Sequence, residues 1–173
     1  MEIFDLYDKL GNKLNKLMER GGENEDGEYH LVTHIWIRNT SGKYLIQQRN
    51  KTDDPVPYQW AATGGAVLTG ETSIEATIRE TYEELGINLK VEEFRLLKRY
   101  VIEDAKANYL TDLYLVEKDI DLNSLILDPI EVKAVAYKTM ADIKQMIQDN
   151  LFWDYSGKMG RHDYFDILEK SKK

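Results

Sequence analysis

Three glutamates of this chain, Glu80, Glu83 and Glu84, are spaced so that they can act together. Residues three and four positions apart are neighbours on an α-helix, so these carboxylates would converge on one face. Like charges in one patch repel one another and raise the carboxyl pKa values. A hard divalent cation such as Mg²⁺ relieves that repulsion, because it prefers oxygen ligands. The spacing therefore indicates either a metal site or an ordinary solvated helix face rich in glutamate.

The segment that must position these glutamates is predicted to be a helix with well-defined ends. Thr72 and Glu75 have the spacing of a capping box, and Gly86 suits the left-handed conformation after the last turn. At about 100° per residue, one stripe of this helix is expected to be buried. That stripe consists of Ile74, Ile78, Thr81 and Leu85. Thr77 lies off the stripe, so we expect it to tolerate a charged replacement.

Together with the glycines before it, this helix resembles the Nudix box. The match reads Gly65, five residues, Glu71, seven residues, Arg79-Glu80, two residues, Glu83-Glu84, one residue, Gly86-Ile87. Thr81 departs from the usual pattern, because an aliphatic residue is common there. The apolar strand after Tyr29 and the pair Gly64-Gly65 also look like parts of a Nudix domain, so the resemblance covers about residues 28 to 140.

The resemblance implies a metal-dependent hydrolase that cleaves a diphosphate linkage in a nucleoside diphosphate derivative or a similar small molecule. It implies Mg²⁺ or Mn²⁺ as cofactor, bound by Glu80, Glu83, Glu84 and the carbonyl group of Gly64. Glu83 would act as a further ligand or as the general base. Arg79 would orient the carboxylates, and Glu71 would be a supporting or bridging acid.

Glu131 is a further candidate for the general base or for an extra metal ligand. It precedes Val132 in a segment that resembles one where the family commonly carries an acidic residue. A solvated loop glutamate is the alternative interpretation. Ile130 stands where a second acid is often seen.

The resemblance also implies the fold, a mixed β-sheet packed between helices in an α/β/α sandwich of the α+β type. Residues 1–28 are expected to form an N-terminal extension that packs on one Nudix domain, residues 29–173. In the extension, residues 13–20 fit a second strand or a helix. Elsewhere the patterns predict strands at 2–7, 29–38, 43–49, 94–102, 109–116 and 132–137, and helices from about 140 and over 162–172.

Composition narrows the class of protein. The net charge is -8 and the pI is about 5.0, which argues against nucleic acid as the main partner. No apolar run approaches the roughly 20 residues that span a bilayer, and no secretory signal is apparent. We therefore expect a soluble cytoplasmic enzyme with a small-molecule diphosphate substrate. The sequence leaves open whether it is a homodimer.

Two other functions are consistent with parts of the sequence. The turn at Asp8 and Gly11, followed by Tyr29-His30, also resembles, more distantly, the isopentenyl diphosphate isomerase branch of the superfamily. That chemistry is usually assigned to a catalytic cysteine, and this chain has none. The other alternative, a nucleotide-ligand sensor without catalysis, would not need the complete set of arginine and glutamates.

Two further groups of residues allow two interpretations each. His30 and His34 share one face of a predicted strand, so they could bind a metal or be ordinary strand residues near a substrate cleft. Trp153 and Tyr155 could stack on a base or a sugar, or could close the core near the C-terminus.

Overall fold

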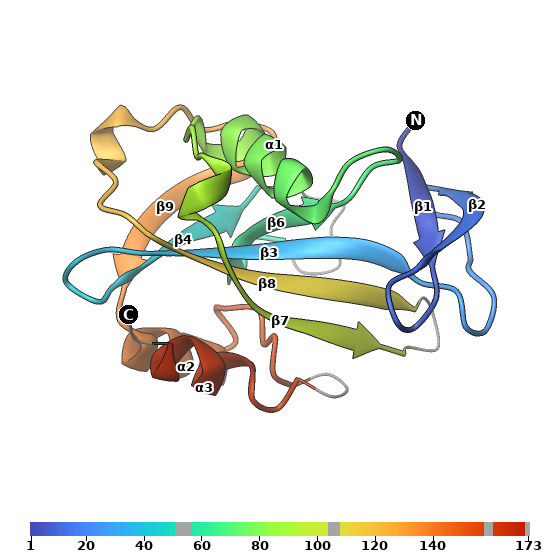
Figure 1. The fold of residues 1–173 in the computed structure, drawn as a ribbon. Coiled ribbons are helices and arrows are strands. Elements are labelled where there is room, and N and C mark those ends of the chain that lie inside the picture. The colour runs from blue at the N-terminus through green and yellow to red at the C-terminus, as the bar shows by residue number, and fades with distance from the viewer. Residues whose placement is uncertain (51–56, 104–107, 158–160, 172–173) are drawn as a thin grey trace.

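The computed structural model describes residues 1–50, 57–103, 108–157 and 161–171. In these residues a mixed sheet of seven strands forms the centre of the molecule (Figure 1). Its strands are β3 (His30–Arg38), β4 (Tyr44–Arg49), β5 (Trp60–Ala61), β6 (Thr63–Ala66), β7 (Arg95–Ile102), β8 (Tyr109–Glu117) and β9 (Val132–Lys138). The order is β5-β4-β3-β8-β7, with β6 paired to β3 and β9 paired to β4. Only the β3–β8 pair is parallel within this part of the chain.

Helices cover both faces of this sheet. They are α1 (Ser73–Leu85), α2 (Met140–Gln148) and α3 (Tyr164–Lys170), and the short 3-10 helices are η1 (Val91–Glu93) and η2 (Leu122–Ser124). In Figure 1, α1 lies on one side of the sheet, whereas α2 and α3 lie together on the other. The predicted mixed sheet between helices is therefore confirmed.

The N-terminal residues form a hairpin of β1 (Ile3–Tyr7) and β2 (Lys13–Glu19), so the strand interpretation of this segment is confirmed. At the turn, the Asp8 carboxylate accepts hydrogen bonds from the N–H groups of Leu10 and Asn12 at 2.8 and 2.9 Å. Tyr7 and Tyr29 form an isolated bridge, and this bridge connects the hairpin to the segment that enters β3.

The core lies in two layers, one on each side of the sheet. Trp36 of β3 is fully buried against the α2–α3 side, together with Ile143 and Tyr164. Phe152 and Tyr155 belong to the same cluster, so the interpretation of the aromatic segment as core is confirmed for these two residues. Trp153 packs against that cluster and is only partly buried.

The expected buried face of α1 is confirmed for Thr81 and Leu85 and wrong for Ile74 and Ile78. The buried residues of the helix are Ser73, Ala76, Thr77, Thr81, Glu84 and Leu85. Thr77 is fully buried, whereas Ile74 and Ile78 are only half-buried. The reason is local: the Thr77 hydroxyl donates to the Ser73 carbonyl at 2.6 Å, so its polar atom needs no water. A threonine satisfied in this way packs as a small apolar residue.

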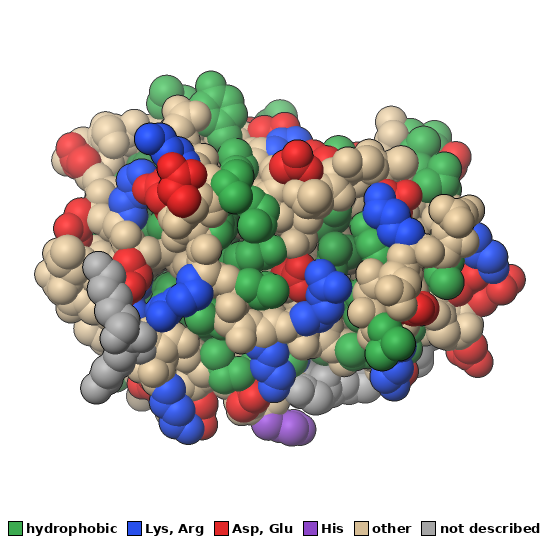
Figure 2. All heavy atoms as spheres, viewed as in Figure 1, with side chains coloured by type: hydrophobic (Ala, Val, Ile, Leu, Met, Phe, Trp, Pro, Cys, Tyr) green, Lys and Arg blue, Asp and Glu red, His purple; other side chains and the backbone are tan. Residues whose placement is uncertain are grey.

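Charges are mixed over the face of the molecule that Figure 2 shows. Lysine and arginine side chains on that face are interspersed with aspartate and glutamate and do not gather into one basic patch. In the described part of the chain, no helix is long and apolar enough to cross a bilayer.

Candidate active site

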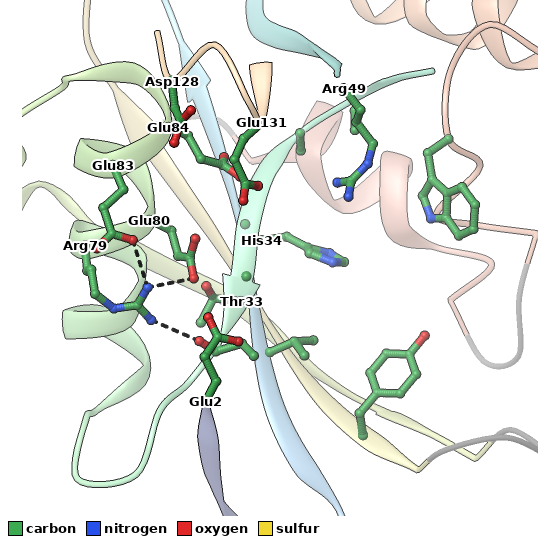
Figure 3. A pocket seen from close by; sticks show the side chains of 18 of the residues that line it. Glu2, Thr33, His34, Arg49, Arg79, Glu80, Glu83, Glu84, Asp128 and Glu131 are labelled. Atoms are coloured by element: carbon green, nitrogen blue, oxygen red, sulfur yellow. Dashed lines mark hydrogen bonds and ion pairs between the residues drawn. The ribbon is translucent and has the colours of Figure 1, made fainter. Parts of the chain in front are cut away.

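A pocket of about 550 Å³ opens beside β6 and has two chemically different ends. Its acidic end is lined by Glu80, Glu83, Glu84, Asp128 and Glu131. Figure 3 shows these carboxylates directed towards one space from α1 and from the segment before β9. The other end is lined by aromatic rings and by His34. This volume is in the range of small-molecule sites.

The ends of α1 fix where its glutamates lie. The Thr72 N–H donates to the Glu75 carboxylate at 2.8 Å, and the Glu75 N–H donates to the Thr72 hydroxyl at 3.3 Å. Gly86 ends the helix with φ of 70°. The predicted capping box and left-handed terminus are therefore confirmed.

Two glycines let β6 pack closely against its neighbours, Gly64 against the backbone of β3 and Gly65 against α1. Gly64 and Gly65 pair with His34 and Thr33 of β3. A Cβ atom at Gly65 would overlap the carboxylate of Glu80, so a larger residue would push this side chain away. The spacing of the box thus puts backbone and carboxylate in contact.

Arg79 holds the acidic residues in place. Its guanidinium donates to Glu71 at 2.7 and 3.0 Å, to Glu80 at 2.8 Å and to Glu83 at 3.2 Å. A fourth group, the carbonyl of Ala66, accepts at 3.1 Å. One planar guanidinium therefore links the glycine-rich loop to the acidic face of α1.

Glu71 supports Arg79 and does not line the pocket. Its carboxylate also accepts a hydrogen bond from the Leu68 N–H at 3.0 Å. Burial alone would raise the pKa of Glu71, but the hydrogen bonds from Arg79 and Leu68 outweigh it and lower the pKa. Glu71 is thus an ionised partner that positions Arg79.

Glu84 is the most deeply buried of the acidic residues that line the pocket, with 5% of its surface exposed. Gln47 of β4 donates to its carboxylate at 2.8 Å. Burial raises the pKa of Glu84 to about 8; the Gln47 hydrogen bond opposes this shift, and the charges of Glu80 and Glu131 add to it. Burial also raises the pKa of Glu80, against the opposing effect of Arg79.

These carboxylates fit a hard divalent cation by their chemistry. Glu80, Glu83 and Glu84 each keep one carboxylate oxygen without a hydrogen bond from any described residue. All the candidate donors are oxygens, the ligand type that Mg²⁺ and Mn²⁺ prefer. Arg79 lies between Glu80 and Glu83 and donates hydrogen bonds to both. In this arrangement, no group of three acidic, histidine or cysteine side chains among the described residues is placed to hold a metal ion.

Glu131, Asp128 and Gln47 complete the acidic end. Glu131, the predicted candidate base, lines the pocket beside Glu84 (Figure 3). The Asp128 N–H donates to the Glu84 carbonyl at 3.0 Å and so ties this segment to the helix. Sequence reasoning did not assign Asp128 or Gln47 to the site. Asp128 could have been found, because it is an acidic residue close to Glu131 in the same segment. Gln47 could not, because it lies 37 positions from its partner Glu84.

The two histidines have different surroundings. His30 does not line the pocket, and its ring lies between Phe4 and Tyr109 at centroid distances of 5.8 and 5.6 Å. His34 is half-buried and lines the pocket. Burial lowers the pKa of His34 to about 3, and the charge of Arg161 adds to the effect. Of the two interpretations, the structure favours strand residues beside a cleft over a metal pair.

Comparisons with known proteins agree with this geometry. The family model described as NUDIX domain matches residues 28–155. An uncharacterized Nudix hydrolase of Listeria monocytogenes is 33% identical over 156 residues, which are 90% of each chain. Nudix hydrolase 3 of Arabidopsis thaliana is 32% identical over 98% of this chain, but the chain spans only 23% of that protein. The crystal structure of a Deinococcus radiodurans protein superposes with a TM-score of 0.70 at 20% identity, covering 99% of this chain and 100% of that one.

The chain belongs to the Nudix family, because the family model covers most of its length and a relative of similar size is a third identical. It is a Nudix-type pyrophosphate hydrolase.

Proposed function

We propose that the pocket hydrolyses a diphosphate linkage in a nucleoside diphosphate derivative or a similar small molecule, with Mg²⁺ or Mn²⁺ as cofactor. The observation that carries this proposal is the convergence of Glu80, Glu84 and Glu131 on one end of a pocket. A cluster of negative charge would repel a diphosphate, so a cation must come between the two.

Glu80, Glu83 and Glu84 are the side chains that would hold the cation, and the carbonyl group of Gly64 would contribute a backbone oxygen. When bound, the cation neutralises charge on the phosphates and makes nearby water more acidic. Arg79 keeps Glu80 and Glu83 oriented through the hydrogen bonds given above. Glu71 in turn holds Arg79.

Two carboxylates are candidates for accepting the proton of the attacking water. Glu83 is half-exposed and already accepts a hydrogen bond from Arg79. Glu131 approaches the acidic cluster from the segment before β9 and lies beside Glu84 (Figure 3). Single Glu83→Gln and Glu131→Gln variants, each titrated with Mg²⁺, distinguish the two candidates. Loss of the base lowers kcat at saturating Mg²⁺, whereas loss of a ligand raises the Mg²⁺ concentration that half-maximal activity requires.

Chromatographic detection of the monophosphate products formed from a panel of diphosphates tests the proposal. The panel consists of nucleoside diphosphates and triphosphates, nucleotide sugars, ADP-ribose, dinucleoside polyphosphates and isoprenoid diphosphates. We expect at least one compound to be hydrolysed with Mg²⁺ or Mn²⁺ and not with EDTA. Millimolar Mg²⁺ or Mn²⁺ should also raise the melting temperature, since a ligand bound only to the folded state stabilises it. Hydrolysis that persists in EDTA, or no hydrolysis of any compound, would contradict the proposal.

A further inference from the structure

The aromatic end of the pocket contains one hydrogen-bond donor whose orientation is fixed by buried residues. His34 lines the pocket, and its Nδ1 atom lies 2.9 Å from the hydroxyl oxygen of Tyr164. The same hydroxyl accepts the indole N–H of Trp36 at 3.0 Å. Trp36 and Tyr164 are both fully buried.

Counting donors and acceptors decides where the imidazole hydrogen lies. An indole nitrogen can only donate, so Tyr164 must accept from Trp36. Among the described residues, His34 is then the only remaining partner for the Tyr164 O–H. A buried hydroxyl without an acceptor is costly, so the Tyr164 O–H donates to Nδ1 of His34. The imidazole hydrogen is therefore on Nε2.

The Nε2 atom is available to a ligand. It makes no hydrogen bond to any described residue, and it is not among the fully buried polar atoms of that part of the chain. Figure 3 shows the His34 ring directed away from the carboxylates of α1, on the side of the pocket where Arg49 lies.

The surroundings of this donor are mostly aromatic, with Arg49 lining the pocket on the same side. Tyr109, Trp153 and Tyr155 line the same pocket, and the Tyr155 ring lies 4.7 Å from the His34 ring. Aromatic walls favour a planar ring, and a neutral N–H donor pairs with a carbonyl oxygen or a ring nitrogen. A phosphate would instead be drawn to charged groups such as a cation at the acidic end.

We infer that His34 recognises the base of a nucleoside diphosphate derivative by donating its Nε2–H to a neutral acceptor on that base. Tyr164 and Trp36 are positioning residues that fix the donor. This inference rests on the proposed function for the location of the diphosphate, which would lie at the acidic end of the same pocket.

The first test measures the imidazole hydrogen directly, without metal or turnover. In protein labelled with ¹⁵N-histidine, long-range proton–nitrogen spectra distinguish the two neutral forms of each of the three histidines. The His34→Gln variant assigns the His34 signals. We expect the Nε2–H form for His34. In Tyr164→Phe, which removes the acceptor for Trp36 and the donor to Nδ1, this preference should weaken. The Nδ1–H form in the wild-type protein would overturn the inference.

The second test adds uncharged nucleosides, which carry a base and no phosphate. Adenosine, guanosine, cytidine and uridine are titrated to about 10 mM, a range that covers weak binding. At least one should shift the His34 Nε2 signal, while ribose 5-phosphate should not. No shift with any nucleoside, or an equal shift with ribose 5-phosphate, would contradict recognition of a base. This result is independent of hydrolysis, so it stays distinguishable from failure of the hydrolysis screen.

A third test separates recognition from structure. His34→Phe removes the donor, and the loss of one hydrogen bond should lower kcat/KM for a base-containing substrate by about tenfold. A purely structural role would lower the rates for base-containing and base-free diphosphates equally. His30→Phe is the matched control, because His30 lies four residues earlier and outside the pocket lining. If His34→Phe leaves the preference for base-containing compounds unchanged, the inference fails.

Discussion

Arg79 is the side chain on which the geometry of the acidic end most depends. Its guanidinium contacts three carboxylates and one carbonyl, from the glycine-rich loop to the middle of α1. A lysine has one ammonium group and lacks the planar fork, so it cannot make these contacts together. The site therefore depends on the planar shape of the Arg79 guanidinium as well as on its positive charge.

The Arg79→Lys variant should keep its fold and lose turnover. We expect kcat to fall by about tenfold or more, because displaced carboxylates no longer meet the substrate in the productive geometry. Arg38→Lys is the matched control, since Arg38 pairs with Glu117 and does not line this pocket. Steady-state rates and circular dichroism of both variants provide the measurement. Similar rates for the two variants would show that Arg79 is not an organising residue.

Glu84 gives the metal-free protein a characteristic pH dependence. Its pKa is raised from 4.5 to about 8 in the folded state, chiefly by burial. The folded state therefore retains a proton that the unfolded chain releases, and stability from this group is lost as the pH rises from about 4.5 to about 8. Burial of His34, whose pKa is lowered to about 3, acts in the opposite direction up to about pH 6.5, so the measurement is a comparison. In thermal melts in EDTA, the wild-type protein should lose stability with rising pH relative to Glu84→Gln. An unchanged slope in Glu84→Gln would contradict the assignment.

The elements of this fold differ in how far their sequence determines them. The ends of α1 could be predicted, because the capping box and Gly86 act within a few residues of one another. The buried face could be predicted only in part. Thr81 and Leu85 are buried as expected, but apolarity also favoured Ile74 and Ile78, whereas the packing uses Thr77, whose hydroxyl is satisfied within the helix. In residues 13–20, the spacing of the leucines was compatible with a helix as well as a strand. The segment forms strand β2 because it pairs with β1.

The corrected face of α1 makes a testable prediction about stability. Thr77→Asp places a carboxylate at a fully buried position, which should cost roughly 3 kcal/mol or more. Ile78→Asp, at a half-buried position, should cost less. Urea denaturation followed by circular dichroism compares the two. If Ile78→Asp is the more damaging change, the buried face has been assigned incorrectly.

At the scale of the whole molecule, the pocket depends on contacts between segments that are far apart in sequence. The backbone N–H of Trp60 donates to the Leu151 carbonyl at 2.8 Å. The backbone N–H of Trp153 donates to the Trp60 carbonyl at the same distance. These bonds hold Trp153 beside β5 and thus at the pocket. The box residues could be predicted because they form one contiguous stretch. Stacking by Trp153 and Tyr155 was one of two alternatives that the sequence allowed. Gln47 and the link from Tyr164 to His34 could not be predicted, because they depend on pairings across more than 30 positions.

Turnover of the Glu84→Gln variant tests the central claim most directly. The change keeps the shape of the side chain and removes one charge at the centre of the acidic end. We predict that kcat for the diphosphate found in the screen, at saturating Mg²⁺, falls by about a hundredfold or more, or roughly 2.7 kcal/mol. Circular dichroism should show a folded protein. Glu75→Gln, at the capping box and outside the pocket, should lose some stability and little rate. A folded Glu84→Gln variant with near wild-type turnover would contradict the account, because the carboxylates of α1 would then not form the active site.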